Sequence, residues 1–346
     1  MKHTGRPNKT RTVLLHLLFF ILETLLLAAI GLHLVLLHVT HGVSPAAARL
    51  FARSVRETSA VGFLADWYCG PEEPETLAEP GRVFVKTDTA LIDETAPAPD
   101  ESGADAWGLV DEDGDGIILC EVKGEGYAGY MMVVLDRTRV VLATDPASYG
   151  RKGHTVEEFA RLHGAVAGIN GGAFLDPNGE GDGSYPLGLV VYEDQIFNDD
   201  VRQGFAGIDG NGILHVGCTC AADAVAEGIR YGASYGPVLV QNGEMTPYDT
   251  LESGVNPRTA IGQRADGAFL LLVIDGRQVL SLGATYLDEA KIMLEYGAVN
   301  AVNMDGGSSS MMWYRDGYVN NSASVIGVRP NPTVWLVLPQ KGGGEP

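Results

Sequence analysis

The sequence predicts an α+β protein in which one N-terminal transmembrane helix precedes a single, β-rich globular domain with few helices. Three observations support this fold class. Residues 13–39 are almost entirely apolar. Beyond residue 105, short β-branched and aromatic runs recur between turn signals, as in strands joined by tight turns. The chain also has 45 glycines, several paired at the ends of these runs, where turns or close backbone approaches require them.

The apolar N-terminal segment predicts a membrane anchor. A spanning helix needs about 20 apolar residues, and residues 13–39 contain a single charged residue, Glu23. Basic residues precede the segment, which favours a cytoplasmic tail over residues 1–12 and an extracytoplasmic domain in a single-pass cell-membrane protein. The alternative is a cleaved signal peptide with an A-x-A-like site at Ala46 and Ala48. The apolar run is longer than a usual signal peptide core and ends well before that site.

The rest of the chain divides by composition. Residues 40–104 are predicted to form a juxtamembrane helix, over about 46–65, and a linker rich in Pro, Glu and Asp with a short strand at Arg82–Lys86. The globular domain is expected over residues 105–338, and residues 339–346 form a tail.

Within the domain, strands outnumber helices. Thr155 can cap a helix that runs to Leu162, and a second helix is expected over 285–296, ended by Gly297. The predicted strands cover residues 116–122, 131–135, 140–143, 165–169, 187–192, 213–216, 238–241, 269–274, 299–303 and 333–338.

The charge distribution excludes one class of partner and constrains another. The chain carries a net charge of −20, and residues 1–39 contribute four basic residues and one acid, or +3, so about −23 falls on the remainder. Such an acidic domain repels phosphate backbones, which excludes nucleic acid as a partner. An anionic substrate would need a local cationic site.

The first candidate motif is the sequence around Asn170, directly after a predicted strand. Gly171 and Gly172 could expose backbone N–H groups to an anion or a sugar hydroxyl. Asn170 offers a donor and an acceptor, and Phe174 could stack on a sugar face. The alternative is a plain hairpin turn.

The second motif follows the strand predicted over residues 299–303. Asp305, Gly306, Gly307, Ser308 and Ser309 place a carboxylate, two glycines and hydroxyls together at a strand end. Such a loop can hold the carboxylate in a cleft beside backbone donors, and the alternative is a serine-rich loop capped by an acid. No G-x-S-x-G elbow is present, which disfavours a serine hydrolase.

Two further strand ends carry charged residues. Arg258 follows Pro257 at the start of an apolar run, and its planar guanidinium suits a phosphate or a carboxylate. Asp275 ends a strongly apolar strand just before Gly276. A surface ion pair and a simple Asp-Gly turn are the respective alternatives.

An acidic run predicts at most weak cation binding. Asp111, Asp113 and Asp115 match the opening of a calcium-binding EF-hand loop, but Val122 stands where a bidentate Glu is required. We interpret the run as a turn that leads into the next strand, and we expect no cofactor or metal site.

Taken in order, these motifs resemble the phosphodiester glycosidase domain. The resemblance covers about residues 115–338, and Ala173 and Ser308 depart from the family pattern. It rests on the following segments: N-G-G-x-F at 170–174, G-P-V-L-V-Q-N-G-E at 236–244, N-P-R-T-A-I-G at 256–262, V-I-D-G-R at 273–277 and M-D-G-G-S-S at 304–309.

The resemblance implies hydrolysis of the bond between a sugar's anomeric carbon and a phosphate, in a family with exopolysaccharide-related bacterial members. On this basis Asp305 is expected to act as nucleophile or to activate water, Asp275 as second carboxylate or orienter, and Arg258 as the cation that stabilises the leaving phosphate. Substrate binding is expected at Asn170, Gly171, Gly172, Phe174, Gly306, Gly307, Ser308 and Ser309.

Two other functions remain open. The domain could be a non-catalytic binding module for anionic cell-envelope polysaccharide. It could also cleave phosphodiesters with a metal ion, although the sequence lacks the His and Asp clusters that such sites usually need.

Overall fold

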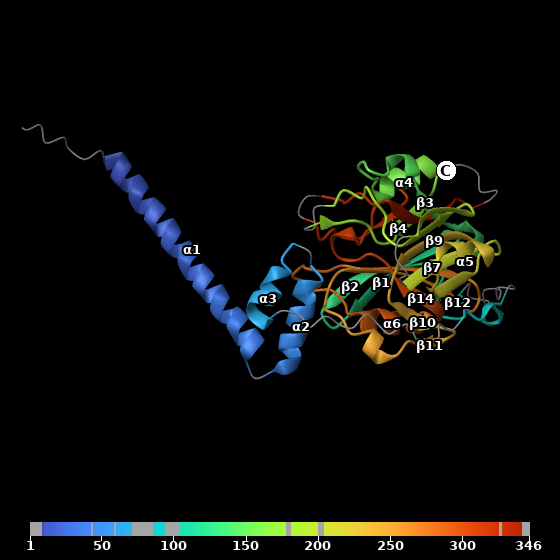
Figure 1. Ribbon diagram of the computed structural model, residues 1–346, viewed down its shortest axis with the longest axis horizontal. Helices are drawn as coiled ribbons and strands as arrows, with labels where there is room; N and C mark the ends of the chain where they lie inside the picture. Colours follow the sequence, from blue (N-terminus) through green and yellow to red (C-terminus); the bar gives the residue numbers. More distant parts are fainter. Residues whose placement is uncertain are drawn as a thin grey trace, which may run out of the picture. The chain divides into compact units, whose positions relative to one another are not determined.

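The computed structural model describes residues 9–42, 44–58, 60–70, 86–93, 104–177, 181–199, 204–324 and 327–340 (Figure 1). The chain forms two compact units. The first consists of residues 1–56 and 61–73, and the second of residues 57–60 and 74–346.

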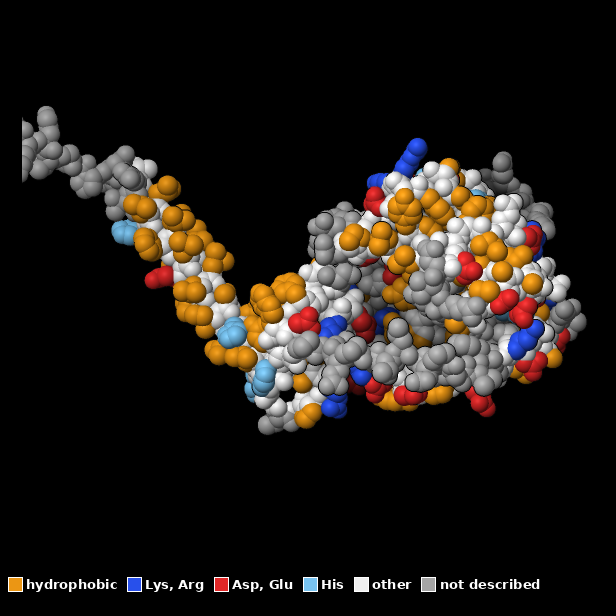
Figure 2. All heavy atoms as spheres, in the orientation of Figure 1, with side chains coloured by type: hydrophobic (Ala, Val, Ile, Leu, Met, Phe, Trp, Pro, Cys, Tyr) orange, Lys and Arg blue, Asp and Glu red, His pale blue; other side chains and the backbone are white. Residues whose placement is uncertain are grey.

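In the described part of the first unit the chain forms three helices, α1 (Lys9–His41), α2 (Pro45–Arg56) and α3 (Phe63–Cys69). Residues Val13–His41 of α1 are long and apolar enough to cross a membrane. Figure 2 shows apolar side chains along the length of α1, in contrast to the mixed surface of the second unit. The single juxtamembrane helix expected over 46–65 is wrong, because the chain forms two helices with a break between Arg56 and Phe63.

The second unit is built on a seven-stranded sheet in which every neighbouring pair is antiparallel. Its strands, in spatial order, are β1 (Ile117–Gly124), β2 (Tyr127–Val134), β13 (Phe269–Ile274), β12 (Arg258–Arg264), β14 (Ala298–Asn303), β10 (Val238–Gln241) and β11 (Glu244–Met245).

Two five-stranded sheets complete the unit. The first has the order β16 (Gly317–Tyr318), β15 (Met312–Tyr314), β4 (Ala167–Asn170), β17 (Thr333–Val337) and β3 (Val140–Thr144). The second has the order β6 (Gln195–Asp199), β5 (Leu189–Tyr192), β9 (Ile229–Tyr235), β7 (Gly204–Asp209) and β8 (Leu214–Cys218).

The main core lies where the three sheets meet. It joins Met132 of the seven-stranded sheet, Trp335 of the second sheet and Leu214 of the third, all fully buried. Because so many apolar side chains leave water here, this shared core is the main source of the unit's stability.

Three helices cover the outer faces of the sheets. Helix α6 (Tyr286–Glu295) packs on the seven-stranded sheet, α4 (Val156–His163) on the second sheet and α5 (Ala221–Ala226) on the third (Figure 1). Thr155 and Thr285 each form a capping box at the start of α4 and α6. These caps satisfy backbone N–H groups that would otherwise lack partners.

The β-rich α+β fold class and its N-terminal apolar helix are confirmed, and all ten predicted domain strands overlap strands in the structure. Strands β6, β7 and β9 were missed, because their glycines and polar residues interrupt the apolar pattern, and the two- and three-residue strands β11, β15 and β16 were missed because they are too short to show one. The predicted strand at Arg82–Lys86 lies outside the described residues except for Lys86, which belongs to no strand. Most of the predicted tails, 1–12 and 339–346, also falls outside them.

Candidate active site

Strand register brings three of the predicted motifs together at one end of the central strands of the seven-stranded sheet. Arg258, the first residue of β12, pairs with Ile274, the last residue of β13. Nearby on β12, Ala260 pairs with Asn303, the last residue of β14. In an antiparallel sheet, the start of one strand lies beside the end of its neighbours. The loops that hold Asp275 and Asp305 therefore emerge next to Arg258.

Asn170 joins the second sheet to this edge. Its Nδ2 donates to the backbone carbonyl of Asp305 at 2.6 Å. Its Oδ1 accepts from Thr259 Oγ1 at 2.9 Å and from the Met311 N–H at 3.1 Å. Asn170 is fully buried. Both ends of its amide are thus used to fix the loop around Asp305, which gives Asn170 a positioning contact rather than an open donor.

The two glycines after Asn170 are also in close contact with neighbouring chain. Gly171 and Gly172 donate their N–H groups to Thr333, and the carbonyl of Gly171 accepts from the Asp305 N–H at 3.1 Å. A side chain on Gly171 would lie 2.7 Å from the Thr333 carbonyl oxygen. The glycines therefore allow the backbones to approach one another.

Asp305 lies in a recessed, polar environment. Burial raises its pKa to about 6, although the Ser309 hydroxyl, the Arg329 guanidinium and the Gly306 N–H favour the charged form, and the carboxylate of Asp176 opposes it. A carboxyl with a pKa near 6 can exist in either protonation state close to neutral pH, which suits general acid–base or nucleophilic chemistry.

Arg329 and Asp176, which the sequence did not indicate, complete the surroundings of Asp305. Arg329 bonds both oxygens of Asp176, at 2.7 and 3.0 Å, and donates to Ser308 Oγ at 2.9 Å. Burial alone would raise the pKa of Asp176, but Arg329 lowers it overall. Phe174 is buried, with the Arg329 guanidinium 5.1 Å from its ring centroid. The ring predicted to stack on a sugar is thus already partly covered by Arg329.

Gly306 and Gly307 let the Asp305 loop lie against the Arg258 loop. The Gly307 N–H donates to the Pro257 carbonyl at 2.9 Å. A Cβ on Gly306 would lie 2.8 Å from that same oxygen. Gly307 has φ +61°, a conformation that favours glycine, and the guanidinium of Arg277 lies beside it.

Arg258 is buried and engaged in hydrogen bonds with its neighbours. Its side chain is 5% exposed, and its Nε donates to the Ala284 carbonyl at 3.0 Å. Its Nη2 donates to Glu57 at 2.8 Å. The Glu57 carboxylate also accepts from Asn256 Nδ2 at 2.9 Å and from the Gly254 N–H at 2.6 Å. A guanidinium, an amide and a backbone N–H thus surround one carboxylate.

Tyr235 and Arg277 lie near the Arg258–Glu57 pair, and their pKa values are shifted by its charges. Burial raises the pKa of Tyr235, and the charges of Asp305, Arg258 and Glu57 all act on it. Burial lowers the pKa of Arg277, as do the positive charges of Arg258 and Arg329, whereas Glu57 opposes them. Arg277 has φ +59°, which is uncommon outside glycine and recurs at functional sites.

The charges of Arg258 and Asp305 therefore both act on Tyr235, and those of Arg258 and Arg329 both act on Arg277, in a strongly acidic domain. Asn170, at the end of β4, bonds the Asp305 loop, and that loop in turn bonds Pro257 next to Arg258. Arg277 belonged to the V-I-D-G-R segment, so its position was visible in the sequence. Arg329 follows a similar pattern, an arginine next to a proline, but no spacing linked it to Asp305.

Asp275 is held by protein donors. Its Oδ1 accepts from Asn320 Nδ2 at 3.0 Å and from the Asn321 N–H at 3.1 Å. Asn320 also donates to the Ser310 carbonyl at 3.0 Å. Asp275 thus fixes the far end of the Asp305 loop, a contact that suits an orienting role, while Asp176 is the carboxylate whose charge acts on Asp305.

The acidic run at the start of β1 forms a turn. Asp111 accepts the N–H groups of Gly114 and Gly116. Arg315 forms ion pairs with Asp113 and with Asp115, the latter at 3.1 Å. Although the three carboxylates lie close enough to share a cation, Arg315 already supplies a positive charge to two of them.

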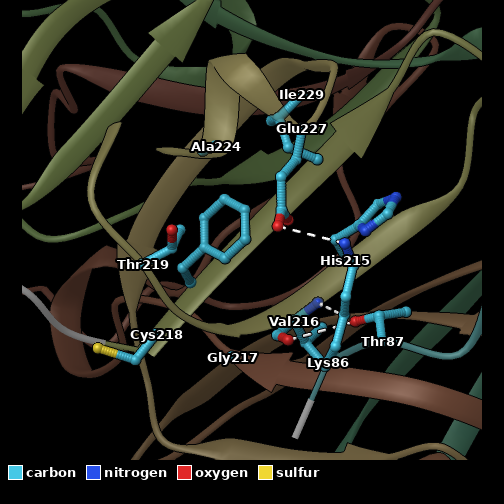
Figure 3. Close-up of a pocket in the computed structure, with 11 residues that line it drawn as sticks. Lys86, Thr87, His215, Val216, Gly217, Cys218, Thr219, Ala224, Glu227 and Ile229 are labelled. Atoms are coloured by element: carbon cyan, nitrogen blue, oxygen red, sulfur yellow. Dashed lines mark hydrogen bonds and ion pairs between the residues drawn. The ribbon is translucent and has the colours of Figure 1, made fainter. Parts of the chain in front are cut away.

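A separate cavity lies beside β8 and α5 (Figure 3). Lys86 and Glu227, which line it, form an ion pair at 3.2 Å, and Thr87 bonds the backbone of Val216. None of the predicted site residues lines this cavity. The charged and strained groups described above are instead at the loop junction.

The comparison with protein families decides the affiliation of the chain. The model of the phosphodiester glycosidase family matches residues 163–338, about half of the chain. The chain belongs to the phosphodiester glycosidase family. The matched segment includes Asn170, Arg258, Asp275 and Asp305.

Curated relatives match a similar share of the chain. The SPbeta prophage-derived uncharacterized protein YomE of Bacillus subtilis is 30% identical over 185 residues, which are 50% of this chain and 28% of that protein. Human N-acetylglucosamine-1-phosphodiester alpha-N-acetylglucosaminidase is 27% identical over 212 residues, 54% of this chain and 40% of the human protein. The chain therefore spans well under half of these relatives.

Solved structures support the fold of this phosphodiester glycosidase domain. The catalytic domain of zebrafish N-acetylglucosamine-1-phosphodiester alpha-N-acetylglucosaminidase, described as auto-inhibited by its pro-peptide, aligns with a TM-score of 0.54 at 19% identity, covering 65% of this chain and 82% of that one. A hypothetical protein from Synechocystis aligns with a TM-score of 0.51 at 16% identity, covering 65% of this chain and 62% of that one.

Proposed function

We propose that this family member is a membrane-anchored, extracytoplasmic hydrolase that cleaves the bond between the anomeric carbon of a sugar and a phosphodiester in a cell-surface or exopolysaccharide-type glycan. The observation that carries the proposal is that the Asp305 loop lies against the Arg258 loop through the Gly307–Pro257 hydrogen bond, with Arg277 beside Gly307 and Arg329 bonded to Ser308. A cationic pocket beside a carboxylate of raised pKa suits an anionic glycosyl phosphate.

Arg258 and Arg277 would bind the phosphate, and Asp305 would face the anomeric carbon. Ordinary glycosidases need a second carboxyl group to protonate the departing oxygen. A phosphate monoester leaves readily because its second pKa is about 6, so guanidinium groups can stabilise the leaving charge instead. Asp305 then serves as nucleophile or activates water. Asn170 and Asp275 hold its loop, and Arg329 and Asp176 set its charge.

Glu57 is proposed to compete with the substrate. Its carboxylate occupies the donors that would bind the phosphate, and it immediately follows the end of α2 in the chain. A tethered carboxylate has a high effective concentration at its own pocket. Self-blocking is also described for the zebrafish catalytic domain, where the pro-peptide is the blocking segment.

The direct test uses the full-length protein in detergent and a panel of sugar-1-phosphodiesters, with Glu57→Ala assayed in parallel. The proposal expects free sugar and a phosphate monoester in equal amounts. Binding of the phosphodiesters without release of sugar by either protein would contradict it and would favour the binding-module alternative. Loss of all activity on chelation, with cleavage of phosphate–alcohol bonds, would instead indicate metal-dependent phosphodiester cleavage.

The activity should depend on pH through Asp305. Because the reaction needs the ionised carboxylate and burial raises its pKa to about 6, we expect kcat/KM to fall by up to about tenfold per pH unit below 6 and to level off above it. Initial rates from pH 4.5 to 8 on a substrate whose charge is constant would measure this. A rate that rises toward low pH would contradict the assigned role.

A further inference from the structure

Glu289 is a buried acid that the proposed chemistry does not use. It lies on α6 and is fully buried. Neither of its carboxylate oxygens has a hydrogen-bond partner among the residues that the structure describes. Burying an unpartnered carboxyl group is costly, so a residue retained only for packing would be apolar here.

The position of Glu289 relates it to Arg258. Tyr286 lies three residues earlier, on the same face of α6, and its ring centroid is 4.1 Å from the Arg258 guanidinium carbon. Helix α6 packs against β12, which begins at Arg258. The charge of Arg258 acts on Glu289, and that of Glu289 acts on Arg258.

Arg258 therefore has two acidic neighbours with different properties. Glu57 lies just after α2, outside any helix or strand, and can move away, whereas Glu289 is held within α6. A buried guanidinium needs a compensating negative charge. With Glu57 in place, one carboxylate suffices and Glu289 can stay neutral. With the pocket empty, Glu289 is the acid that remains beside Arg258.

We propose that Glu289 is a positioning residue that ionises to hold Arg258 when the pocket is empty, and that an anion entering the pocket is accompanied by one proton taken up from solvent onto the Glu289 carboxylate. This inference rests on the proposed phosphate-binding role of Arg258. The inference adds that the negative charge beside Arg258 alternates between the bound anion and the ionised Glu289 carboxylate. Arg258 therefore keeps its position after one anion leaves and before the next one binds.

The surroundings of Glu289 fit this exchange. Burial raises the pKa of Glu289, Arg258 opposes that rise, and Asp288 and Glu57 add to it. Among the strands packed against α6, β10 and β14 carry no charged residue, and β11 carries only the exposed Glu244. Strand β12 carries Arg258 at its start and Arg264 at its end, and Arg264 is paired with Asp105 and Asp266. Removing Glu57 should therefore lower the pKa of Glu289, and a new anion should raise it again.

The sign of the pH effect follows. In a protein without Glu57, protons must be taken up for an anion to bind, so the affinity for the anion falls as pH rises above the pKa of Glu289 in the empty pocket. A linkage of one proton corresponds to about a tenfold change in Kd per pH unit. Asp305 also titrates nearby, but it is present in every variant compared below.

The experiment measures sulfate binding by calorimetry, since sulfate keeps its charge between pH 5 and 9. Full-length Glu57→Ala and the double variant Glu57→Ala/Glu289→Gln are titrated in two buffers of different protonation heat. We expect proton uptake of up to one per sulfate in the first variant and a clear loss of that uptake in the second. Glu57→Ala/Glu295→Gln, which changes an exposed acid on the same helix, should behave like the first.

Equal proton uptake with and without Glu289 would overturn the inference, and so would a failure of sulfate to bind to Glu57→Ala at any pH. The proposed hydrolysis fails separately, if sulfate binds with the expected proton uptake but no sugar phosphodiester is cleaved.

A second measurement excludes a merely structural role. Glu289→Met should raise Tm by a few degrees, because it removes an unpartnered buried acid, whereas a structural residue would lower Tm on replacement.

Discussion

Replacing Asp305 by Asn should abolish measurable hydrolysis, with kcat lowered by about 10²- to 10⁴-fold. The amide keeps the size of the side chain, while it can neither attack the anomeric carbon nor take a proton from water. The measurement is release of free sugar from a sugar-1-phosphodiester under single-turnover conditions. Activity within threefold of the unmodified protein would remove Asp305 from the mechanism.

The Tm of Asp305→Asn shows whether a loss of activity is due to misfolding. Burial raises the pKa of Asp305 to about 6, so the stabilising contribution of this group is complete below its unfolded pKa and is lost as pH rises through 6. Asn has no such loss. We therefore expect Asp305→Asn to have a Tm equal to or above that of the unmodified protein at pH 8. A much lower Tm would mean that the loss of activity reflects misfolding.

Replacing Glu57 by Ala should increase kcat/KM by about tenfold or more. The carboxylate of Glu57 holds Arg258, Asn256 and the Gly254 N–H, so the substrate binds only to the fraction of molecules from which it has withdrawn. Removing a competing state raises apparent affinity by the inverse of that fraction. The effect should appear chiefly in KM, and Glu57→Gln should give a smaller gain.

The matched control for this variant is Glu244→Ala, which removes an exposed carboxylate from the same unit and should leave kcat/KM unchanged. An unchanged or lower kcat/KM in Glu57→Ala would show that Glu57 does not block the pocket. Inorganic phosphate should also inhibit Glu57→Ala more strongly than the unmodified protein, because the donors are then open.

The strand-end residues could be predicted from the sequence because each follows a recognisable apolar run. Asp275 and Asp305 follow the ends of β13 and β14, Arg258 begins β12, and antiparallel pairing then brings all three to the same end of these strands. Asn170 was expected to contact the substrate, yet its amide holds the Asp305 loop. A sequence motif shows that an asparagine is needed at this position, but it does not show whether the side chain contacts the substrate or another part of the protein.

The residues that the sequence did not indicate are those whose roles depend on distant partners. Glu57 lies 201 positions from Arg258, and Asp176 lies 153 positions from Arg329. Nothing in the local pattern around Glu57 distinguishes it from other acids in a chain with 44 of them. Glu289 lies on a helix whose apolar residues clearly predict a packing face. One acidic residue scarcely changes that apolar pattern, so the sequence did not show that Glu289 is buried.

The central claim is that the junction of Asp305 with the arginines breaks the bond between the anomeric carbon and oxygen. The most direct test is to let Glu57→Ala hydrolyse a sugar-1-phosphodiester in water enriched in oxygen-18 and to locate the label by mass spectrometry. Attack at the anomeric carbon predicts the label in the sugar and none in the phosphate. Label in the phosphate would contradict the claim, because it would mean that water attacks phosphorus.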